Sequence, residues 1–301
     1  MTSPSLDPIR FGKPTYIYRG LQQAGMILLG VALLVAMWEG YKAFGSWTGG
    51  TWPGTERELP VPSDNLNMPH SYDIVKQLFE PVTRRADETL FSFLFKSAWF
   101  TFKMAFLGFV IGTIVGLALA VVMLRSSWLE RGLVPWINVS QTIPLIALAP
   151  LVVTWGRGSF LSDTQSVAVI AAYLTFFPVA VNGLAGLKSP DSEALELMRS
   201  FAAPWSKTLV KLRFPAARPY LFPAFRLAAA LSVVGTIVGE ISAGVKGGVG
   251  RVVLDYAGKY STGPERLYGS ILAAAALGLF VFGIITLAEK ILMRGQVGGS
   301  A

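Results

Sequence analysis

Few residues in this chain have the types and spacing that chemistry requires. Its 301 residues include no cysteine and one histidine, His70. Thiol chemistry and disulfides are therefore excluded, and His70 has no second His or Cys with which to share a metal ion. No G-x-x-x-x-G-K-[ST] phosphate loop is present. We therefore expect no catalytic residue, metal site or cofactor in this chain, and no enzyme.

Glu240 is the ionisable residue whose position most suggests a function. It is the only charged residue in the apolar run Leu227–Ser242. A carboxylate at membrane depth is costly and usually faces a partner or a wet cavity. Because the glycine-rich turn Gly247–Gly250 follows, capping of this turn is the alternative. We predict a gating or packing role for Glu240, without deciding between the two.

Long uncharged or nearly uncharged runs indicate the elements that position these residues. Hydrophobic residues make up 52% of the chain and charged residues only 15%, compared with about 25% charged in soluble proteins. A membrane-spanning helix needs about 20 apolar residues. Six segments fit: Gly20–Trp38, Met104–Leu124, Gly132–Gly156, Thr164–Leu187, Leu227–Ser242 and Leu267–Ala288. The sequence predicts an all-α integral membrane protein with about six transmembrane helices, comprising an arm over 1–19 and a single membrane domain over 20–301.

The charges divide unevenly between the two sides that six spans define. Segments on the side of the termini carry fourteen basic and six acidic residues, and the rest of the chain balances to zero. By the positive-inside rule, both termini and the loop 188–218 are cytoplasmic, and the loop of about 45–92 is external. Because topology accounts for the net charge of +8, we expect no nucleic acid as a partner.

Local patterns predict details of the spans and loops. Tyr72–Pro81 is expected to form a short amphipathic helix with Ile74, Val75 and Leu78 on one side. In the second span, glycine recurs at every fourth position and should let another helix approach closely; these residues are Gly108, Gly112 and Gly116.

The third span contains three prolines around a polar stretch, which comprises Ser140, Gln141 and Thr142. Proline removes a backbone donor, and nearby hydroxyl and amide groups can satisfy the freed carbonyls. Either a kinked packing helix or a broken helix that lines a polar path would fit. In the second case Gln141, Thr142 and Pro144 would line the path, together with Glu240.

The loop 188–218 carries an amphipathic pattern. Ser189-Pro-Asp191 is a typical helix start, and apolar residues then recur at helical spacing: Ala194, Leu197, Met198, Phe201 and Trp205. Pro204 interrupts this pattern, and a second short helix is expected over Lys207–Phe214, before Pro215. Such a hairpin either lies against lipid headgroups or docks onto a partner, and composition alone slightly favours the lipid surface.

The same loop resembles a motif of bacterial ABC importer permeases, E-A-A-x3-G-x9-I-x-L-P. Glu196 and Pro215 match it at the right spacing, and Ala202 stands at its glycine. The resemblance implies that this loop contacts an ATPase. The residues implied in this coupling are Glu196, Met198, Arg199, Phe201, Ala202, Pro204, Trp205, Leu212, Phe214 and Pro215.

A second resemblance is independent of the first. Gln141-Thr-Ile-Pro-Leu-Ile-Ala-Leu-Ala-Pro-Leu151 and the following Trp155-Gly156 are similar to the third-span signature of nitrate/sulfonate/taurine-type permeases. Phe176-Phe-Pro178, Met68-Pro69 and the pairing of Glu240 with Gly247–Gly250 also fit that family.

Together the resemblances imply a type I importer permease in the bacterial inner membrane, with a coupling helix between spans four and five. The implied partners are a second permease (identical or a paralogue), two ATPase subunits that bind ATP and Mg, and an external binding protein. With no Arg or Lys in the predicted spans three to five, a neutral heteroaromatic, vitamin or pyrimidine precursor is favoured as substrate, with a sulfonate, nitrate or other small anion as the alternative. A secondary transporter is the alternative class, but it would need more spans and more intramembrane charges.

Overall fold

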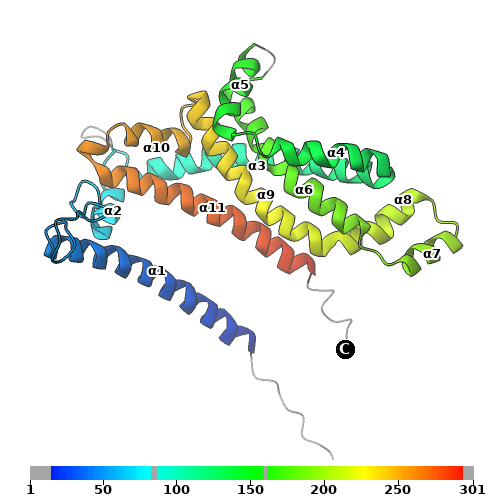
Figure 1. Ribbon diagram of the computed structural model, residues 1–301, viewed down its shortest axis with the longest axis horizontal. Coiled ribbons are helices and arrows are strands. Elements are labelled where there is room, and N and C mark those ends of the chain that lie inside the picture. The colour runs from blue at the N-terminus through cyan, green and yellow to red at the C-terminus, as the bar shows by residue number, and fades with distance from the viewer. Residues whose placement is uncertain (1–14, 83–86, 159–160, 294–301) are drawn as a thin grey trace, which may run out of the picture. The chain divides into compact units, whose positions relative to one another are not determined.

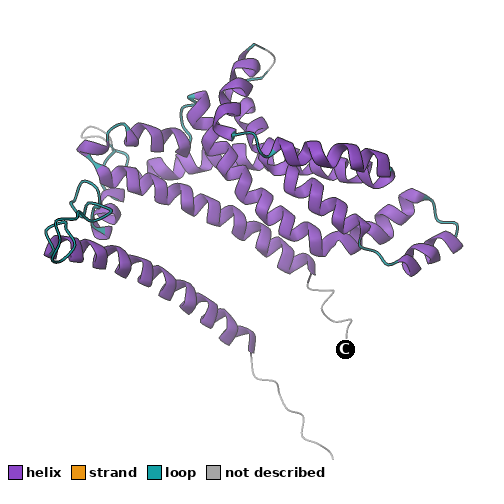
Figure 2. Cartoon of the chain, in the orientation of Figure 1, coloured by secondary structure: helices purple, strands orange, loops and turns teal. Residues whose placement is uncertain are grey.

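A computed structural model describes residues 15–82, 87–158 and 161–293. Residues 1–14 of the predicted arm lie outside this range, as do Arg10, Lys13 and Arg294 among the residues used for the topology. The described chain is helical throughout its regular elements (Figure 2). It divides into two compact units, residues 1–75 and 76–301, with the boundary inside helix α2, Ser71–Leu78.

The first unit consists mainly of α1, Thr15–Trp47, and the loop that follows. Polar residues near the end of α1 hold this loop. The Trp38 indole donates to the Pro69 carbonyl at 2.9 Å, and buried Lys42 donates to Asn65 Oδ1 at 2.6 Å and to the Met68 carbonyl. Glu39 accepts from the Ser71 amide at 2.7 Å. These hydrogen bonds fix the loop against the last turns of α1.

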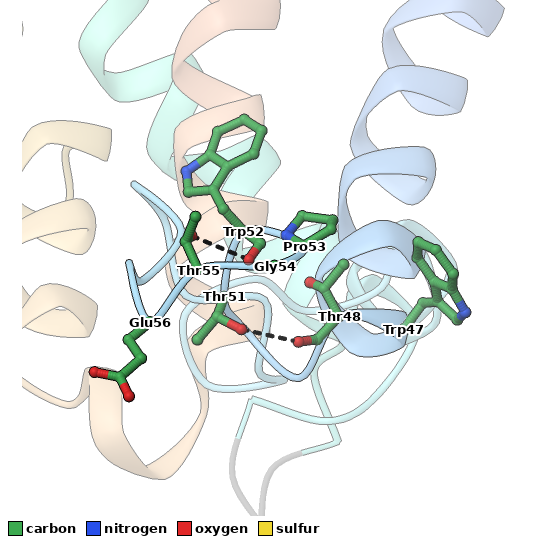
Figure 3. A pocket seen from close by; sticks show the side chains of 8 residues that line it. All are labelled: Trp47, Thr48, Thr51, Trp52, Pro53, Gly54, Thr55 and Glu56. Atoms are coloured by element: carbon green, nitrogen blue, oxygen red, sulfur yellow. Dashed lines mark hydrogen bonds between the residues drawn. The ribbon is translucent and has the colours of Figure 1, made fainter.

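Aromatic side chains gather where α1 ends and the loop begins, and Figure 3 shows two of them, Trp47 and Trp52. Phe44 lies 6.3 Å from Trp47 and 6.2 Å from Trp52, centroid to centroid. The segment 47–56 encloses an open hollow of about 550 Å³, and the Trp47 side chain is 79% exposed. Tryptophan at the end of a spanning helix is typical of the membrane–water interface.

The second unit contains the remaining helices. Their bounds are α3 Leu90–Arg125, α4 Ser127–Ser140, α5 Leu145–Arg157, α6 Asp163–Lys188, α7 Ser192–Ser200, α8 Trp205–Thr208, α9 Phe214–Ala243, α10 Val249–Ala257 and α11 Pro264–Met293. In the whole described chain, five helices are long and apolar enough to cross a membrane, and the pair α4–α5 would make a sixth span. The expectation of about six spans is thus met as five or six.

The centre of this unit is the packing of α3, α6 and α9 (Figure 1). A Cβ atom at Gly108 would lie 2.8 Å from the Ala168 carbonyl oxygen, one at Gly112 2.6 Å from that of Ala172, and one at Gly116 2.7 Å from that of Phe176. The predicted close approach at these glycines is confirmed, with α6 as the partner. Only hydrogen fits at these positions, so the two backbones are in direct contact.

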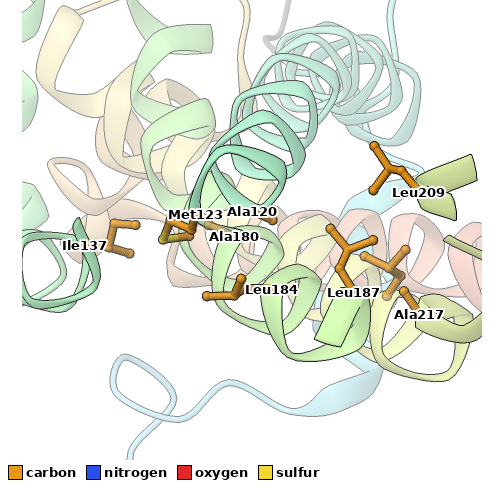
Figure 4. Close-up of a cluster of buried hydrophobic side chains, with 9 residues drawn as sticks. Ala120, Met123, Ile137, Ala180, Leu184, Leu187, Leu209 and Ala217 are labelled. Carbon is orange, nitrogen blue, oxygen red and sulfur yellow. The ribbon is translucent and has the colours of Figure 1, made fainter. Parts of the chain in front are cut away.

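An apolar cluster closes one end of the unit (Figure 4). Met123 of α3, Leu184 and Leu187 of α6, Ile137 of α4 and Leu209 meet there and are buried. Buried apolar surface of this kind provides most of the packing free energy. The cluster therefore fixes the end of α6 and the turn at Leu209, the two segments between which α7 and α8 lie.

Two local expectations need correction, and one alternative that the sequence left open is decided. Ile74 of α2 is buried, but Val75 is 53% exposed and does not share its face. The third span is broken rather than kinked, because α4 and α5 meet at an angle of 100°. Pro215 does not end a helix: a π-helical turn, Leu209–Arg213, precedes it, and the helical segment runs from Trp205 to Ala243. Proline has no N–H to donate to the preceding turn. Because a π turn shifts the hydrogen-bond register just before Pro215, the helix can continue through this residue.

Candidate functional site

Helix α7 is the core of the predicted coupling loop and is exposed except on one side, where Ala194, Leu195 and Met198 are half-buried. None of its residues is buried, and Figure 1 shows it at one end of the second unit, together with α8. Leu197 is 57% exposed and Phe201 76% exposed. Glu196 and Arg199 are exposed as well, whereas Met198 is half-buried. The helix starts two residues later than Ser189-Pro-Asp191 suggested, with Asp191 as its N-cap, because Ser189 caps the end of α6.

A Schellman motif ends α7, with Ala202 in its left-handed position. Ala202 has φ +49° and is the only non-glycine residue of the described chain with positive φ. The Ala203 amide donates to the Met198 carbonyl at 3.0 Å, and the Ala202 amide to the Arg199 carbonyl at 2.8 Å. This is the bond pair that defines the motif, in which glycine is the usual residue. The position aligned with the glycine of the family motif therefore has the backbone that favours glycine.

The chain after Ala202 returns to the body of the unit. Pro204 stands just before α8, and the Trp205 ring lies 5.6 Å from the Arg125 guanidinium, within the range of a cation–π contact. The Arg213 guanidinium donates to the Leu187 carbonyl at 2.7 Å. Leu212, Phe214 and Pro215 are half-buried, and Phe214 packs on the apolar cluster. The predicted coupling residues thus separate into an exposed face on α7 and an anchored base.

Glu240 lies in α9, far along the chain from this loop, and is completely buried. Its Oε1 accepts from the Thr101 hydroxyl at 2.8 Å, and its Oε2 accepts from the Gly250 amide at 2.9 Å. The Val249 amide in turn donates to Thr101 Oγ1 at 2.9 Å. The carboxylate therefore caps the N-terminus of α10, where the free amides and the helix dipole favour a negative charge.

The glycine-rich turn is shaped around this carboxylate. A Cβ atom at Gly248 would lie 2.1 Å from Glu240 Cδ, and one at Gly250 would lie 2.5 Å from the Ile237 carbonyl oxygen. Glu240 and the turn thus form one packed unit that joins α3, α9 and α10. This geometry corresponds to the capping alternative, and a gating role stays a prediction.

Gln141, Thr142 and Pro144 lie together at the break between α4 and α5. Gln141 ends α4, and Pro144 precedes α5. The Thr142 hydroxyl donates to the Val139 carbonyl at 2.8 Å, and the Tyr173 hydroxyl donates to that of Ser140. The side-chain amide nitrogen of Gln141, Nε2, is buried without a hydrogen-bond partner among the described residues. In the part of the chain that the structure describes, no hydrogen bond joins this break to Glu240.

Several residues of these sites were missed by the sequence reasoning. Thr101, the hydrogen-bond partner of Glu240, was not predicted. Nor were Arg125 and Arg213, whose contacts hold the predicted coupling loop in place. The only available signal for Thr101 was its position on the small-residue face of α3, where Ser97 and Ala105 are also buried. His70, which has no second His or Cys beside it in the sequence, contacts Glu39 instead, with 2.8 Å between His70 Nδ1 and Glu39 Oε2.

Comparison with known proteins gives consistent matches. Residues 108–293 match the family described as "Binding-protein-dependent transport system inner membrane component". The chain is 31% identical over 197 residues to the formylaminopyrimidine transport permease protein ThiX of Halalkalibacterium halodurans, an alignment that covers 64% of this chain and 74% of the relative. For the riboflavin transport system permease protein RibX of Chloroflexus aurantiacus, identity is 30%, covering 56% of this chain and 60% of the relative.

The putative aliphatic sulfonates transport permease protein SsuC of Bacillus subtilis is 28% identical, with 63% of this chain and 66% of the relative covered. The chain thus spans less than two thirds of the length of RibX and SsuC.

The matched region contains the second half of α3 and all of α4–α11, so it includes the predicted coupling loop, the break and Glu240. It covers more than half of the chain, and the relatives are permeases of transport systems, so the predictions of a transport component and of the family are confirmed. The chain belongs to the family of binding-protein-dependent transport system inner membrane components.

Proposed function

We propose that this chain is the permease subunit of an ATP-driven importer and that α7 docks onto a separate cytoplasmic ATPase. The observation that carries the docking proposal is the exposure of α7. An amphipathic helix that leaves its apolar residues uncovered, Phe201 at 76% exposure among them, suits recognition by a groove in a partner. The half-buried base at Leu212–Pro215 would transmit movements of this helix to α9.

The charge of α7 favours a protein groove over a lipid surface. Asp191, Glu193 and Glu196 stand against Arg199 in and just before this helix, so its net charge is negative. The cytoplasmic leaflet is anionic and attracts basic segments. An acidic helix gains nothing from that surface, whereas it can pair with cations in a groove.

We further propose that two permeases, identical or paralogous, pack around a central path and receive solute from an external binding protein. The support comes from α5. Its residues Ala149 and Val153 are buried, but its large apolar side chains are exposed: Ile146 at 74%, Leu151 at 50% and Trp155 at 69%. These exposed side chains follow directly on the polar break at Gln141. A second permease packed around α5 would bury them and enclose the break.

The substrate that we propose is a neutral heteroaromatic compound, with a sulfonate, nitrate or other small anion as the alternative. The apolar run Gly132–Gly156 holds no cation. Arg226 of α9 is compensated by Glu289 of α11, with 3.5 Å between Arg226 Nε and Glu289 Oε2. Formylaminopyrimidine and riboflavin are substrates in the names of two relatives. Calorimetric titration of the partner binding protein with both compound classes would decide between them.

A pair of charge insertions tests the docking proposal. Phe201→Asp places a carboxylate on the apolar face, where burial without a partner costs several kcal/mol (~2–7 kcal/mol), so the ATPase should be lost on purification. Ser192→Asp is the matched control, because Ser192 is exposed on the opposite face of α7, and it should retain the ATPase. Equal retention by both variants would contradict docking through α7. Solute uptake that needs no ATP would instead favour a secondary transporter.

A further inference from the structure

A charged cleft lies at the opposite end of the second unit from α7. It is formed by α10, by the turn Tyr260–Thr262 and by the first turn of α11, against the start of α3. We call it the α10–α11 cleft; its volume is about 240 Å³. Figure 1 shows α10 and α7 at opposite ends of this unit. Because the helical segment Trp205–Ala243 connects the two, they must lie on opposite sides of the membrane if it spans.

The cleft is built on fixed elements. Glu240 holds the N-terminus of α10 through the Gly250 amide. Val252 and Tyr256 of α10 pack with Leu90 and Leu94 of α3 in a buried apolar cluster. The walls are therefore in place before any partner arrives, which reduces the entropic cost of binding.

Cations dominate the cleft. Asp255, which also lines the cleft, is compensated by Arg251, with 3.0 Å between Arg251 Nε and Asp255 Oδ1. Neither Lys259 nor Arg266, which both line the cleft, has a carboxylate within ion-pair distance among the described residues. Burial raises the pKa of the Tyr256 hydroxyl, so this group keeps its proton at physiological pH. The cleft thus offers two cations and a hydroxyl beside the apolar side chains of Phe93 and Val252.

This combination suits a carboxylate on a short apolar stem, as in a glutamate or aspartate side chain. We propose that the α10–α11 cleft receives an acidic segment of the external binding protein. The inference rests on the proposed function, because α7 on the ATPase side puts the cleft on the side where that protein arrives. Two cations on a rigid wall supply both electrostatic steering and a fixed docking point.

A lipid phosphate is the other anion that such a cleft could meet. The position of the cleft argues for the protein: α10 and the turn Tyr260–Thr262 belong to none of the candidate spans.

The test uses the complete transporter with its ATPase in lipid nanodiscs and measures the Kd of the binding protein. The double variant Lys259→Glu/Arg266→Glu should weaken binding at least tenfold at low salt. It should also abolish most of the salt dependence of the wild-type Kd, since screening acts on these charges. Lys246→Glu is the control, because Lys246 is an exposed cation just before α10 that does not line the cleft; its Kd should stay within twofold of wild type.

Other outcomes would overturn the inference. A wild-type Kd in the double variant would do so, as would equal losses in the double variant and the control, which would indicate a general surface charge effect. An unchanged Kd together with loss of co-purified anionic lipid would assign the cleft to lipid instead. Retention of the ATPase is recorded in every sample, so a failure of the proposed function, seen already in the wild type, is distinguishable from a failure at this cleft.

Discussion

Ala202 shows how one residue can report on a function through its backbone. Left-handed φ values cost alanine about 1 kcal/mol or more relative to glycine. The Schellman bonds from Ala202 and Ala203 to the last turn of α7 hold this residue in place despite that cost. The strain lies at the end of the helix that we propose to dock.

Replacing Ala202 by glycine should relieve this strain and stabilise the end of α7 by about 1 kcal/mol. Hydrogen exchange of the amides at 202 and 203 should then slow about fivefold, with the ATPase retained as in the wild type. Ala194→Gly is the matched control, because it removes alanine from the helix interior and should speed exchange instead. Faster exchange in Ala202→Gly would contradict the assignment of strain to this position.

At the scale of elements, the carboxylate of Glu240 joins three helices. Thr101 belongs to α3, Glu240 to α9, and Gly250 to the first turn of α10. Removing one partner of such a buried network leaves the others unsatisfied, which costs more than the bond itself contributes. A movement of α10 relative to α9 would therefore require this network to break.

Two substitutions distinguish the roles of this network. Glu240→Gln keeps the volume but loses the charge at the helix N-terminus, and it should reduce stability by about 1–2 kcal/mol and impair transport more than assembly. Gly248→Ala should prevent assembly, since its Cβ would lie 2.1 Å from Glu240 Cδ. Gly258→Ala at the other end of α10 is the control, because the nearest atom to its Cβ would lie at an ordinary 3.6 Å.

The measurements are solute uptake and the yield of the assembled complex for each variant. Wild-type uptake by Glu240→Gln at normal yield would reduce Glu240 to a structural cap. Normal assembly of Gly248→Ala would show that the turn is looser than its contacts indicate.

The sequence predicted those features of the elements that depend on local pattern. Uncharged runs located the spanning helices, and the spacing of Gly108, Gly112 and Gly116 predicted a close helix contact, although not its partner. The continuation of the helix through Pro215 was missed, because a π turn has no signal in composition. The capping of α10 by Glu240 was present only as an alternative, since it depends on Thr101, which is 139 residues away in the chain.

At the scale of the whole molecule, the prediction concerns orientation in the membrane. The excess of basic residues predicts that α7 is cytoplasmic and that the loops around residues 55 and 261 are external. The chain has no cysteine, so single cysteines can be introduced at Thr55, Ser192 and Ser261, all of which are exposed. In intact cells an impermeant thiol reagent should label the cysteines at 55 and 261, and should label the one at 192 only after lysis.

Labelling at 192 in intact cells, without labelling at 261, would invert the topology and place α7 away from any ATPase. Labelling at all three positions would indicate that the segment Trp205–Ala243 does not cross the membrane.

The uninterrupted helical segment Trp205–Ala243 has a mechanical consequence. Its 39 residues correspond to a rod of about 58 Å. Trp205, whose ring contacts Arg125, lies at one end of this rod, and the turn around Glu240 lies near the other. A rod that moves as one piece amplifies rotation: tilting it by about 5° displaces its far end sideways by about 5 Å. A small swing at the base of α7 would thus suffice to move the turn around Glu240 by several ångströms, with no chain of local rearrangements between the two ends.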